Sequence, residues 1–96
     1  MGSGGSIKRV RVLFSGRVQG VGFRYTAYRI ATPFDLTGYV RNRSDGDVEL
    51  VAEGSERELT ELLDGIRASH LNSHIVREQL CWVAATGEFG KFRISD

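Results

Sequence analysis

Gly16-Arg-Val-Gln-Gly-Val-Gly-Phe-Arg24 is the stretch that decides the fold of this 96-residue chain, because it joins a strand-like pattern to a helical one. Before it, apolar residues alternate over 10–14, which predicts a half-buried strand. After it, apolar residues recur at helical spacing over 23–31. Pro33 ends that helix, because the residue before a proline avoids the helical region. The glycines between the two patterns predict a tight loop over 15–22.

The rest of the chain predicts a second helix and further strands. Ser55-Glu-Arg-Glu58 is a capping box, in which the serine hydroxyl and the glutamate carboxylate each accept from an orphan backbone N–H. A helix with an apolar face follows it, up to Ile66. Gly46 lies in a segment with hairpin chemistry between two strands. The expected strands of this part are 37–43, 47–53, 75–84 and, as a short fifth strand, 89–94.

The order of these elements is β-α-β-β-α-β with a short strand at the end. It indicates the α+β class and a ferredoxin-like βαββαβ sandwich: an antiparallel sheet with two helices on one face and a short C-terminal strand. We expect residues 7–96 to form a single domain and residues 1–6 to be a flexible N-terminal linker or a cloning remnant. This fold hosts many activities, so its chemistry must be sought in particular residues.

Composition excludes several classes of protein. Thirteen Lys and Arg residues stand against twelve Asp and Glu residues, a net charge of +1. No long-range charge therefore favours nucleic acid or an acidic membrane as a partner. No apolar stretch approaches the roughly 20 residues of a membrane span. Cys81 is the single cysteine and can form no internal disulfide, which suits a reducing cytoplasm.

The loop over 16–22 has the chemistry of an anion site. A strand that turns tightly into a helix directs several backbone N–H groups into one concavity, and the helix dipole adds positive charge there. Arg24, in the first turn of the helix, can bind phosphate oxygens in a bidentate manner. The same residues also suit a plain glycine-rich connector with a surface arginine. The loop is not a Walker A motif, because it lacks the Gly-Lys-Ser/Thr ending.

The segment Gly16–Arg24 resembles the signature of the acylphosphatases, GRVQGVGFR. Two later blocks are similar to the same family: Gly38-Tyr-Val-Arg-Asn-Arg43 followed by Gly46-Asp-Val-Glu49, and Gly87-Glu-Phe-Gly90 leading into Phe92-Arg-Ile94. The resemblance covers about Lys8 to Ile94. Tyr39 stands where the family often has Trp, and Ser44 where bacterial members often have Pro. These two departures bear on substrate preference more than on the reaction.

The resemblance implies a monomer that hydrolyses acyl phosphates to a carboxylate and inorganic phosphate. It implies that Arg24 and the loop amides bind the phosphoryl group and that Asn42 orients the attacking water, so these two are the expected catalytic residues. By itself, Asn42 would also suit a strand end where it satisfies local backbone. Neither a cofactor nor a metal is expected, because no carboxylate cluster suits magnesium. The expected substrate-binding residues are Gly16, Arg17, Val18, Gln19, Gly20, Val21, Gly22 and Phe23.

Other reactive side chains have simpler interpretations. His70 and His74 lie beyond the expected end of the second helix with no further ligands nearby, which favours a solvated loop pair over a metal site. Cys81 lies in a strand without a basic neighbour to activate it, so we expect a thiol of the core or the sheet face rather than a nucleophile. Four arginines are expected on the sheet, either simply solvated or steering an anionic substrate toward the loop: Arg9, Arg11, Arg41 and Arg43.

Two other functions remain open at this point. One is a binding module for acyl or carbamoyl phosphate without turnover, similar to the acylphosphatase-like domain of hydrogenase-maturation proteins. The other is an RNA-binding domain, since RNA-recognition motifs share the ferredoxin-like order but need exposed aromatic residues on central strands. Glu49, Val51 and Glu53 on the outward face of the third strand argue against RNA. Hydrolysis is the preferred hypothesis, followed by the binding module.

Overall fold

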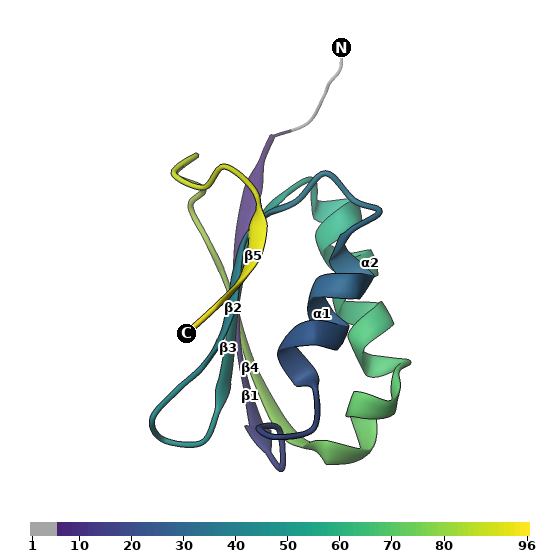
Figure 1. Ribbon diagram of the computed structural model, residues 1–96. Coiled ribbons are helices and arrows are strands. Elements are labelled where there is room, and N and C mark those ends of the chain that lie inside the picture. The colour runs from purple at the N-terminus through teal and green to yellow at the C-terminus, as the bar shows by residue number, and fades with distance from the viewer. Residues whose placement is uncertain (1–5) are drawn as a thin grey trace.

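The computed structural model describes residues 6–96, so the expected linker at 1–6 lies outside the described residues except for Ser6. Two α-helices pack on one face of a single sheet (Figure 1). The elements are β1 (Lys8–Gly16), α1 (Phe23–Ala31), β2 (Thr37–Asn42), β3 (Val48–Gly54), α2 (Glu56–Arg67), the 3-10 helix η1 (His70–His74), β4 (Ile75–Val83) and β5 (Phe92–Ser95). Within these residues, no helix is both long enough and apolar enough to cross a membrane.

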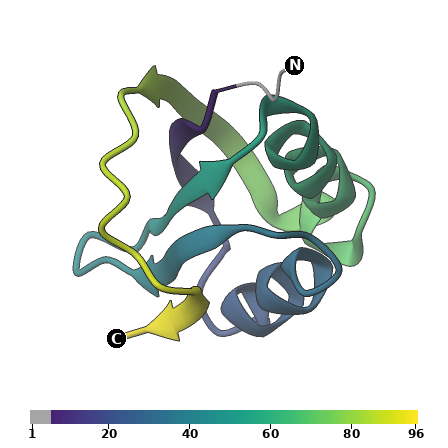
Figure 2. The ribbon, with the colours of Figure 1, turned by 90° about the horizontal axis from the view of Figure 1, so that it is seen from above.

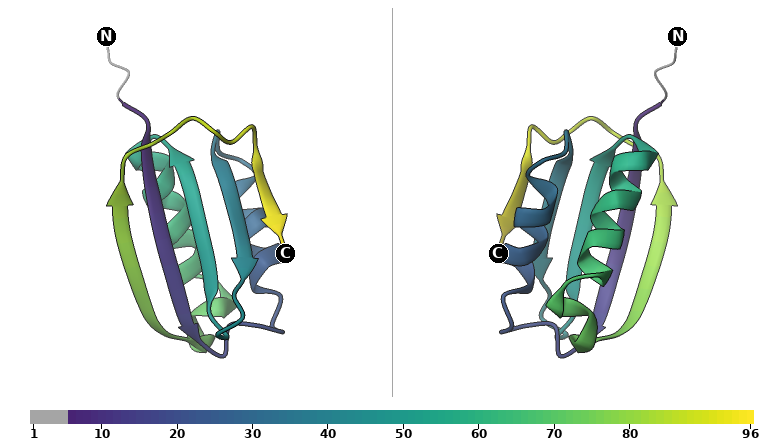
Figure 3. Two further views of the ribbon diagram at one scale, coloured as in Figure 1. Left: turned by 90° about the vertical axis from the view of Figure 1, so that its left-hand side faces the viewer. Right: turned by 90° about the vertical axis from the view of Figure 1, so that its right-hand side faces the viewer.

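The sheet has the strand order β4-β1-β3-β2-β5, seen face-on in the left view of Figure 3. The pairs β1·β3, β1·β4 and β2·β3 are antiparallel, which confirms the ferredoxin-like prediction for the first four strands. The fifth strand differs: β5 pairs in parallel with β2, and it begins at Phe92 rather than at residue 89. The connection over 84–91 carries the chain from the β4 edge to the β2 edge (Figure 2), so β5 runs in the direction of β2.

Both helices begin and end where local chemistry predicts. Helix α1 ends at Ala31, two residues before Pro33. Ser55 caps α2, and its Oγ accepts a hydrogen bond from the backbone N–H of Glu58 at 3.2 Å. The glutamate side of the capping box differs from the prediction, because the Glu58 carboxylate instead contacts the Ser55 hydroxyl at 3.4 Å and the Asp35 N–H at 3.5 Å. The apolar faces of the two helices and of the sheet bury Val10, Val12, Phe14, Ala27, Val40, Leu50, Leu59, Leu62 and Ile66.

The other face of the sheet is covered by ion pairs between arginines and buried glutamates. Glu49, only 3% exposed, accepts hydrogen bonds from Nε of Arg11 at 2.7 Å and of Arg41 at 2.6 Å. Glu53, only 2% exposed, accepts one from Nε of Arg9 at 2.7 Å. Of the two alternatives for the sheet arginines, these ion pairs weigh against the steering of an anion, because Glu49 and Glu53 compensate the charges of Arg9, Arg11 and Arg41. The strand register places Arg9 opposite Glu53 and Arg41 opposite Glu49, whereas Arg11 reaches Glu49 diagonally from its place opposite Val51.

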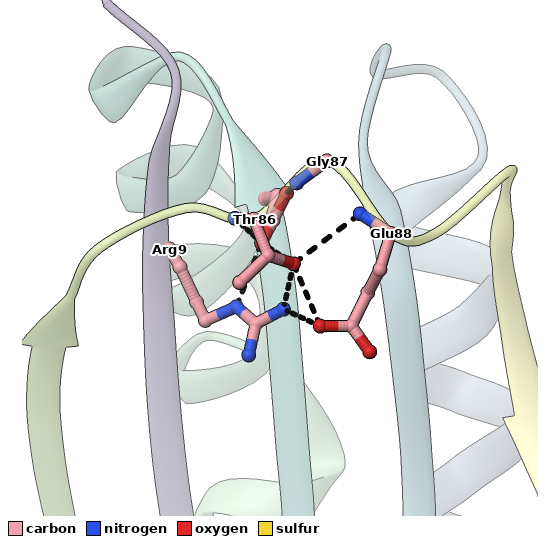
Figure 4. Close-up of polar contacts among 5 residues, drawn as sticks. Arg9, Thr86, Gly87 and Glu88 are labelled. Atoms are coloured by element: carbon pink, nitrogen blue, oxygen red, sulfur yellow. Dashed lines mark hydrogen bonds and ion pairs between the residues drawn. The ribbon is translucent and has the colours of Figure 1, made fainter.

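Glu53 also fastens the 84–91 connection to the sheet. Its carboxylate accepts hydrogen bonds from the backbone N–H groups of Thr86 at 2.9 Å and Gly87 at 3.0 Å. Arg9 Nη2 donates to the Thr86 hydroxyl at 2.8 Å and to the Glu88 carboxylate at 2.9 Å (Figure 4). The ring of Phe89 then lies over Arg9, with the guanidinium carbon 4.9 Å from its centroid. These contacts hold the connection that leads into β5.

The charge of Glu53 depends on these partners. Burial raises the pKa of the Glu53 carboxyl, but hydrogen bonds from Thr86, Arg9 and Gly87 outweigh burial and hold that pKa below its usual value. The unfolded chain therefore takes up a proton on Glu53 at a higher pH, about 4.3, than the folded protein does. The stabilisation is present above this pH and is lost as the pH falls through the lower pKa of the folded state.

We predict that Glu53→Gln lowers the free energy of unfolding at pH 7 by about 1–3 kcal/mol, because the amide cannot accept all the bonds that the carboxylate accepts. The variant should also lose less stability than the parent when the pH falls below about 4.3. Urea denaturation at pH 7 and at acid pH measures both effects. The control is Glu61→Gln on the exposed face of α2, which should change stability by less than about 0.5 kcal/mol. Equal acid sensitivity in the parent and Glu53→Gln would contradict the assignment.

Candidate active site

The loop between β1 and α1 leads into a helix whose N-terminus has no side-chain cap. Gly20 and Gly22 have φ values of +79° and +78°, a left-handed conformation in which a Cβ costs about 1–2 kcal/mol. Gly22 is the N-cap of α1 and offers no side chain, and the first turn contains no acidic residue. The first N–H groups of α1 therefore have no side-chain cap within the described residues. Together with the helix dipole, these donors suit an anion.

Three contacts fix the shape of this loop. The Gln19 side chain donates through Nε2 to the carbonyl oxygens of Arg43 at 2.7 Å and Asp47 at 2.9 Å. The Arg17 backbone N–H donates to the carbonyl oxygen of His74 at 3.0 Å. Val18 is fully buried in the core beneath the loop. The loop is thus tied to the β2–β3 turn on one side and to η1 on the other.

Arg24 is the second residue of α1, and its side chain is half-buried. Its Nη1 donates to the backbone carbonyl oxygen of Ser95 in β5 at 3.1 Å. The other N–H groups of the guanidinium have no hydrogen-bond partner among residues 6–96, which leaves them available to an anion. The C-terminal strand therefore orients Arg24 without neutralising its charge.

Asn42 is the last residue of β2, next to the β2–β3 turn. The turn is closed by other groups: the Arg43 N–H donates to the Asp47 carbonyl oxygen at 2.8 Å, and the Asp45 carboxylate accepts from the Asp47 N–H at 3.0 Å. In the described part of the chain, the Asn42 side chain has no hydrogen-bond partner. The local backbone is thus satisfied without Asn42, and its amide is available to a ligand.

These groups meet around one pocket of about 200 Å³. Its lining residues are Val18, Gly20, Gly22, Phe23, Arg24, Tyr25, Asn42 and Ile94. The lining includes both residues expected to be catalytic and four of the eight expected to bind substrate. It contains no carboxyl, imidazole or thiol group. Backbone N–H groups, one guanidinium and one carboxamide can bind an anion and position a water molecule, and the Tyr25 hydroxyl is the one other polar side-chain group of the lining.

The other four expected substrate-binding residues do not line the pocket; they fix the position of the loop. Gly16 pairs with Ile75 in the sheet, and Val21 packs against the core. Arg17 and Gln19 make the contacts with η1 and the β2–β3 turn described above. Sequence reasoning did not single out Tyr25 or Ile94 as lining residues. Tyr25 follows Arg24 directly in the sequence, and this could have indicated that it lines the pocket. Ile94 reaches the pocket only through the long-range pairing of β5 with β2, which the sequence does not indicate.

The side chains set aside in the sequence lie away from the pocket lining. His70 and His74 are in η1 with ring centroids 6.4 Å apart, and His70 Nε2 lies 3.4 Å from the Val21 carbonyl oxygen. Among residues 6–96, no group of three or more His, Cys, Asp or Glu side chains is placed to hold a metal ion. Cys81 is exposed on β4, opposite Arg11 in the neighbouring strand. It is a thiol of the sheet face and not of the core.

A family model and the curated relatives point to the same family. The acylphosphatase family model matches residues 10–94. The acylphosphatase of Caldanaerobacter subterraneus subsp. tengcongensis is 39% identical over 87 residues, which cover 91% of this chain and 97% of that protein. The crystal structure of the Bacillus subtilis acylphosphatase is 32% identical, with a TM-score of 0.84, and the match covers 93% of this chain and 99% of that one. The full-length HypF structure, in a phosphate- and nucleotide-bound form, is 28% identical with a TM-score of 0.87, over 100% of this chain and 13% of that one.

We predict that inorganic phosphate shifts the amide NMR signals of residues 18–25 first, because the uncapped donors lie there. Gly22→Ala should weaken phosphate binding, since the left-handed φ of residue 22 is strained for alanine although no atom lies within 4 Å of the added Cβ. Gly90→Ala is the control, because an added Cβ at Gly90 also meets open space and Gly90 lies outside the pocket. Shifts centred on η1, or equal loss of binding in both variants, would contradict the site.

Proposed function

The chain belongs to the acylphosphatase family, and on that premise we propose that the loop over 16–22 and Arg24 hold the phosphoryl group of an acyl phosphate while Asn42 orients the attacking water. The enzyme hydrolyses the carboxyl–phosphate anhydride to a carboxylate and inorganic phosphate. One observation carries the assignment of residues: uncapped N–H groups, the Arg24 guanidinium and the unpartnered Asn42 amide line the same pocket.

Hydrolysis of an acyl phosphate requires few groups beyond those that line this pocket. Water attacks phosphorus, the bond from phosphorus to the bridging oxygen breaks, and the acyl group leaves as a carboxylate. The conjugate acid of that leaving group has a pKa near 4, so it departs without a proton from a general acid. The remaining tasks are to position the water and to stabilise charge on the phosphoryl oxygens. A lining without carboxyl, imidazole or thiol groups is suited to such a substrate.

Arg24 and Asn42 have different tasks in this scheme. The planar guanidinium of Arg24 binds two phosphoryl oxygens at once, which a lysine cannot reproduce. Asn42 offers a carbonyl oxygen that accepts a hydrogen bond from the attacking water and so sets the direction of attack. A carboxamide takes up no proton at neutral pH, so the proton of the attacking water passes to a substrate oxygen or to solvent.

We also propose that residues 7–96 act as a single domain, as a cytoplasmic monomer, without a cofactor and without a nucleic-acid partner. The open face of the sheet supports the absence of a nucleic-acid partner. Glu49 and Glu53 form ion pairs with its arginines, and Phe89 packs on Tyr39 with ring centroids 5.8 Å apart. A module that binds an acyl or carbamoyl phosphate without turnover is the second function, which the likeness to HypF favours.

We predict that Arg24→Ala impairs phosphate binding and turnover together, because Arg24 contacts the phosphoryl group in the ground state and the transition state alike. Arg24→Lys should restore little of either.

Asn42→Ala should lower kcat by about a hundredfold or more and change the Kd for phosphate much less, because Asn42 acts mainly on the water. The measurements are kcat and KM with benzoyl phosphate, the phosphate Kd by titration, and circular dichroism to confirm folding.

Two matched controls lie at exposed positions outside the pocket lining, Arg57→Ala in α2 and Asn72→Ala in η1, and both should behave like the parent. A folded Asn42→Ala protein with nearly normal kcat would contradict the water-positioning role. An Asn42→Ala protein that binds phosphate far more weakly would move Asn42 into the anion site. Phosphate binding by the parent without turnover of any acyl phosphate would favour the binding module.

A further inference from the structure

The pocket has an apolar side that phosphoryl binding does not use. Tyr25 and Ile94 line it together with Arg24 and Asn42, and they are 58% and 40% exposed. They come from different elements, the first turn of α1 and the strand β5. Two large side chains from distant parts of the chain thus present bare apolar surface beside the uncapped helix end.

The Tyr25 ring is held in place by Arg29. Arg29, one helical turn later, donates through Nη1 to the Tyr25 hydroxyl at 3.1 Å. The Arg29 guanidinium carbon also lies 5.8 Å from the ring centroid, within the range of a cation–π contact. Arg29 therefore restrains the Tyr25 side chain through its hydroxyl and its ring, while the side chain stays 58% exposed. A ring that is already fixed loses little conformational entropy when a ligand packs on it.

Ile94 is placed by the sheet. It pairs with Val40 of β2 and shares a strand face with Phe92, which is buried against the helix layer. The next residue, Ser95, supplies the carbonyl oxygen that binds Arg24. Ile94 is therefore fixed one residue from the contact that orients the anion-binding guanidinium.

We propose that Tyr25 and Ile94 form the binding site for the acyl group and that they favour aromatic and bulky apolar acyl groups over small ones. The proposal rests on the proposed function, in which the phosphoryl group lies at the N-terminus of α1. Only the bridging oxygen separates phosphorus from the acyl carbon, so the acyl group must lie in the same pocket. Arg24 is the one charged side chain of the lining, and it faces the phosphoryl group. The apolar surface of Tyr25 and Ile94 is left for the acyl group.

The test compares kcat/KM for benzoyl phosphate and acetyl phosphate in Tyr25→Ala, Tyr25→Phe and Ile94→Ala. Tyr25→Ala and Ile94→Ala should lower kcat/KM for benzoyl phosphate by about tenfold or more and change the value for acetyl phosphate much less, as expected for a lost apolar contact. Tyr25→Phe keeps the ring and should keep the selectivity. The inhibition constant of inorganic phosphate should not change in any of them. Tyr25 is exposed, so its truncation leaves the core intact.

The matched control is Tyr28→Ala, which truncates the same side chain on the same helix at a position that lines a different cavity, with Phe34 and Lys91. It should leave the selectivity unchanged. An equal fall for both substrates in Tyr25→Ala, or no fall for either, would overturn the acyl-group site while phosphate still inhibits the parent competitively. If Arg24→Ala leaves phosphate inhibition intact, the proposed phosphoryl site itself is wrong, and the acyl-group site is wrong with it.

Discussion

Helix α1 begins without a side-chain cap, and the arrangement of the site follows from that set of unpaired backbone N–H groups. A helix end leaves its first N–H groups without partners, and a serine, threonine, asparagine or aspartate side chain at the cap position commonly satisfies one of them. Here Gly22 occupies the cap position. The chain must therefore reach the helix through left-handed residues, and Gln19 must fasten the loop to the turn that follows Asn42. Because Gly22 provides no side-chain cap, the first N–H groups of α1 stay unpaired, and these groups form the anion site beside Asn42.

The two faces of the sheet have separate tasks. The helix face holds the apolar core, and the pocket lies at one end of it, where the last residue of β2 and Ile94 of β5 lie near the start of α1. The open face is closed by Glu49 and Glu53, whose burial is tolerable only because arginine and backbone donors satisfy them. Glu53 fastens the 84–91 connection, which brings β5 to the β2 edge, and β5 supplies both the Ser95 carbonyl oxygen and Ile94. An ion-pair layer on one face thus supports the position of the anion-binding arginine on the other.

Local signals in the sequence predict the local structure well. Pro33 marks the end of α1, Ser55 marks the start of α2, and the glycines of 16–22 mark the loop, because each acts through neighbouring backbone. What escapes prediction depends on contacts between distant segments. The parallel pairing of β5, the occupation of Arg9 and Arg41 by Glu53 and Glu49, and the arrival of Ile94 at the pocket all require the strand register. Gln19 shows the difference within a single motif: its place in the loop is readable from the sequence, but its bonds to the β2–β3 turn are not.

The central claim is that the pocket acts on the phosphorus of an acyl phosphate and not on its carbonyl carbon. Hydrolysis of benzoyl phosphate in water enriched in ¹⁸O tests this directly, because the two products can be analysed separately by mass spectrometry. Attack by a water molecule held beside Asn42 on a phosphoryl group held by Arg24 and the α1 amides places the label in inorganic phosphate and leaves benzoate unlabelled. Label in benzoate would mean that the carbonyl carbon is the centre attacked, and it would contradict the account.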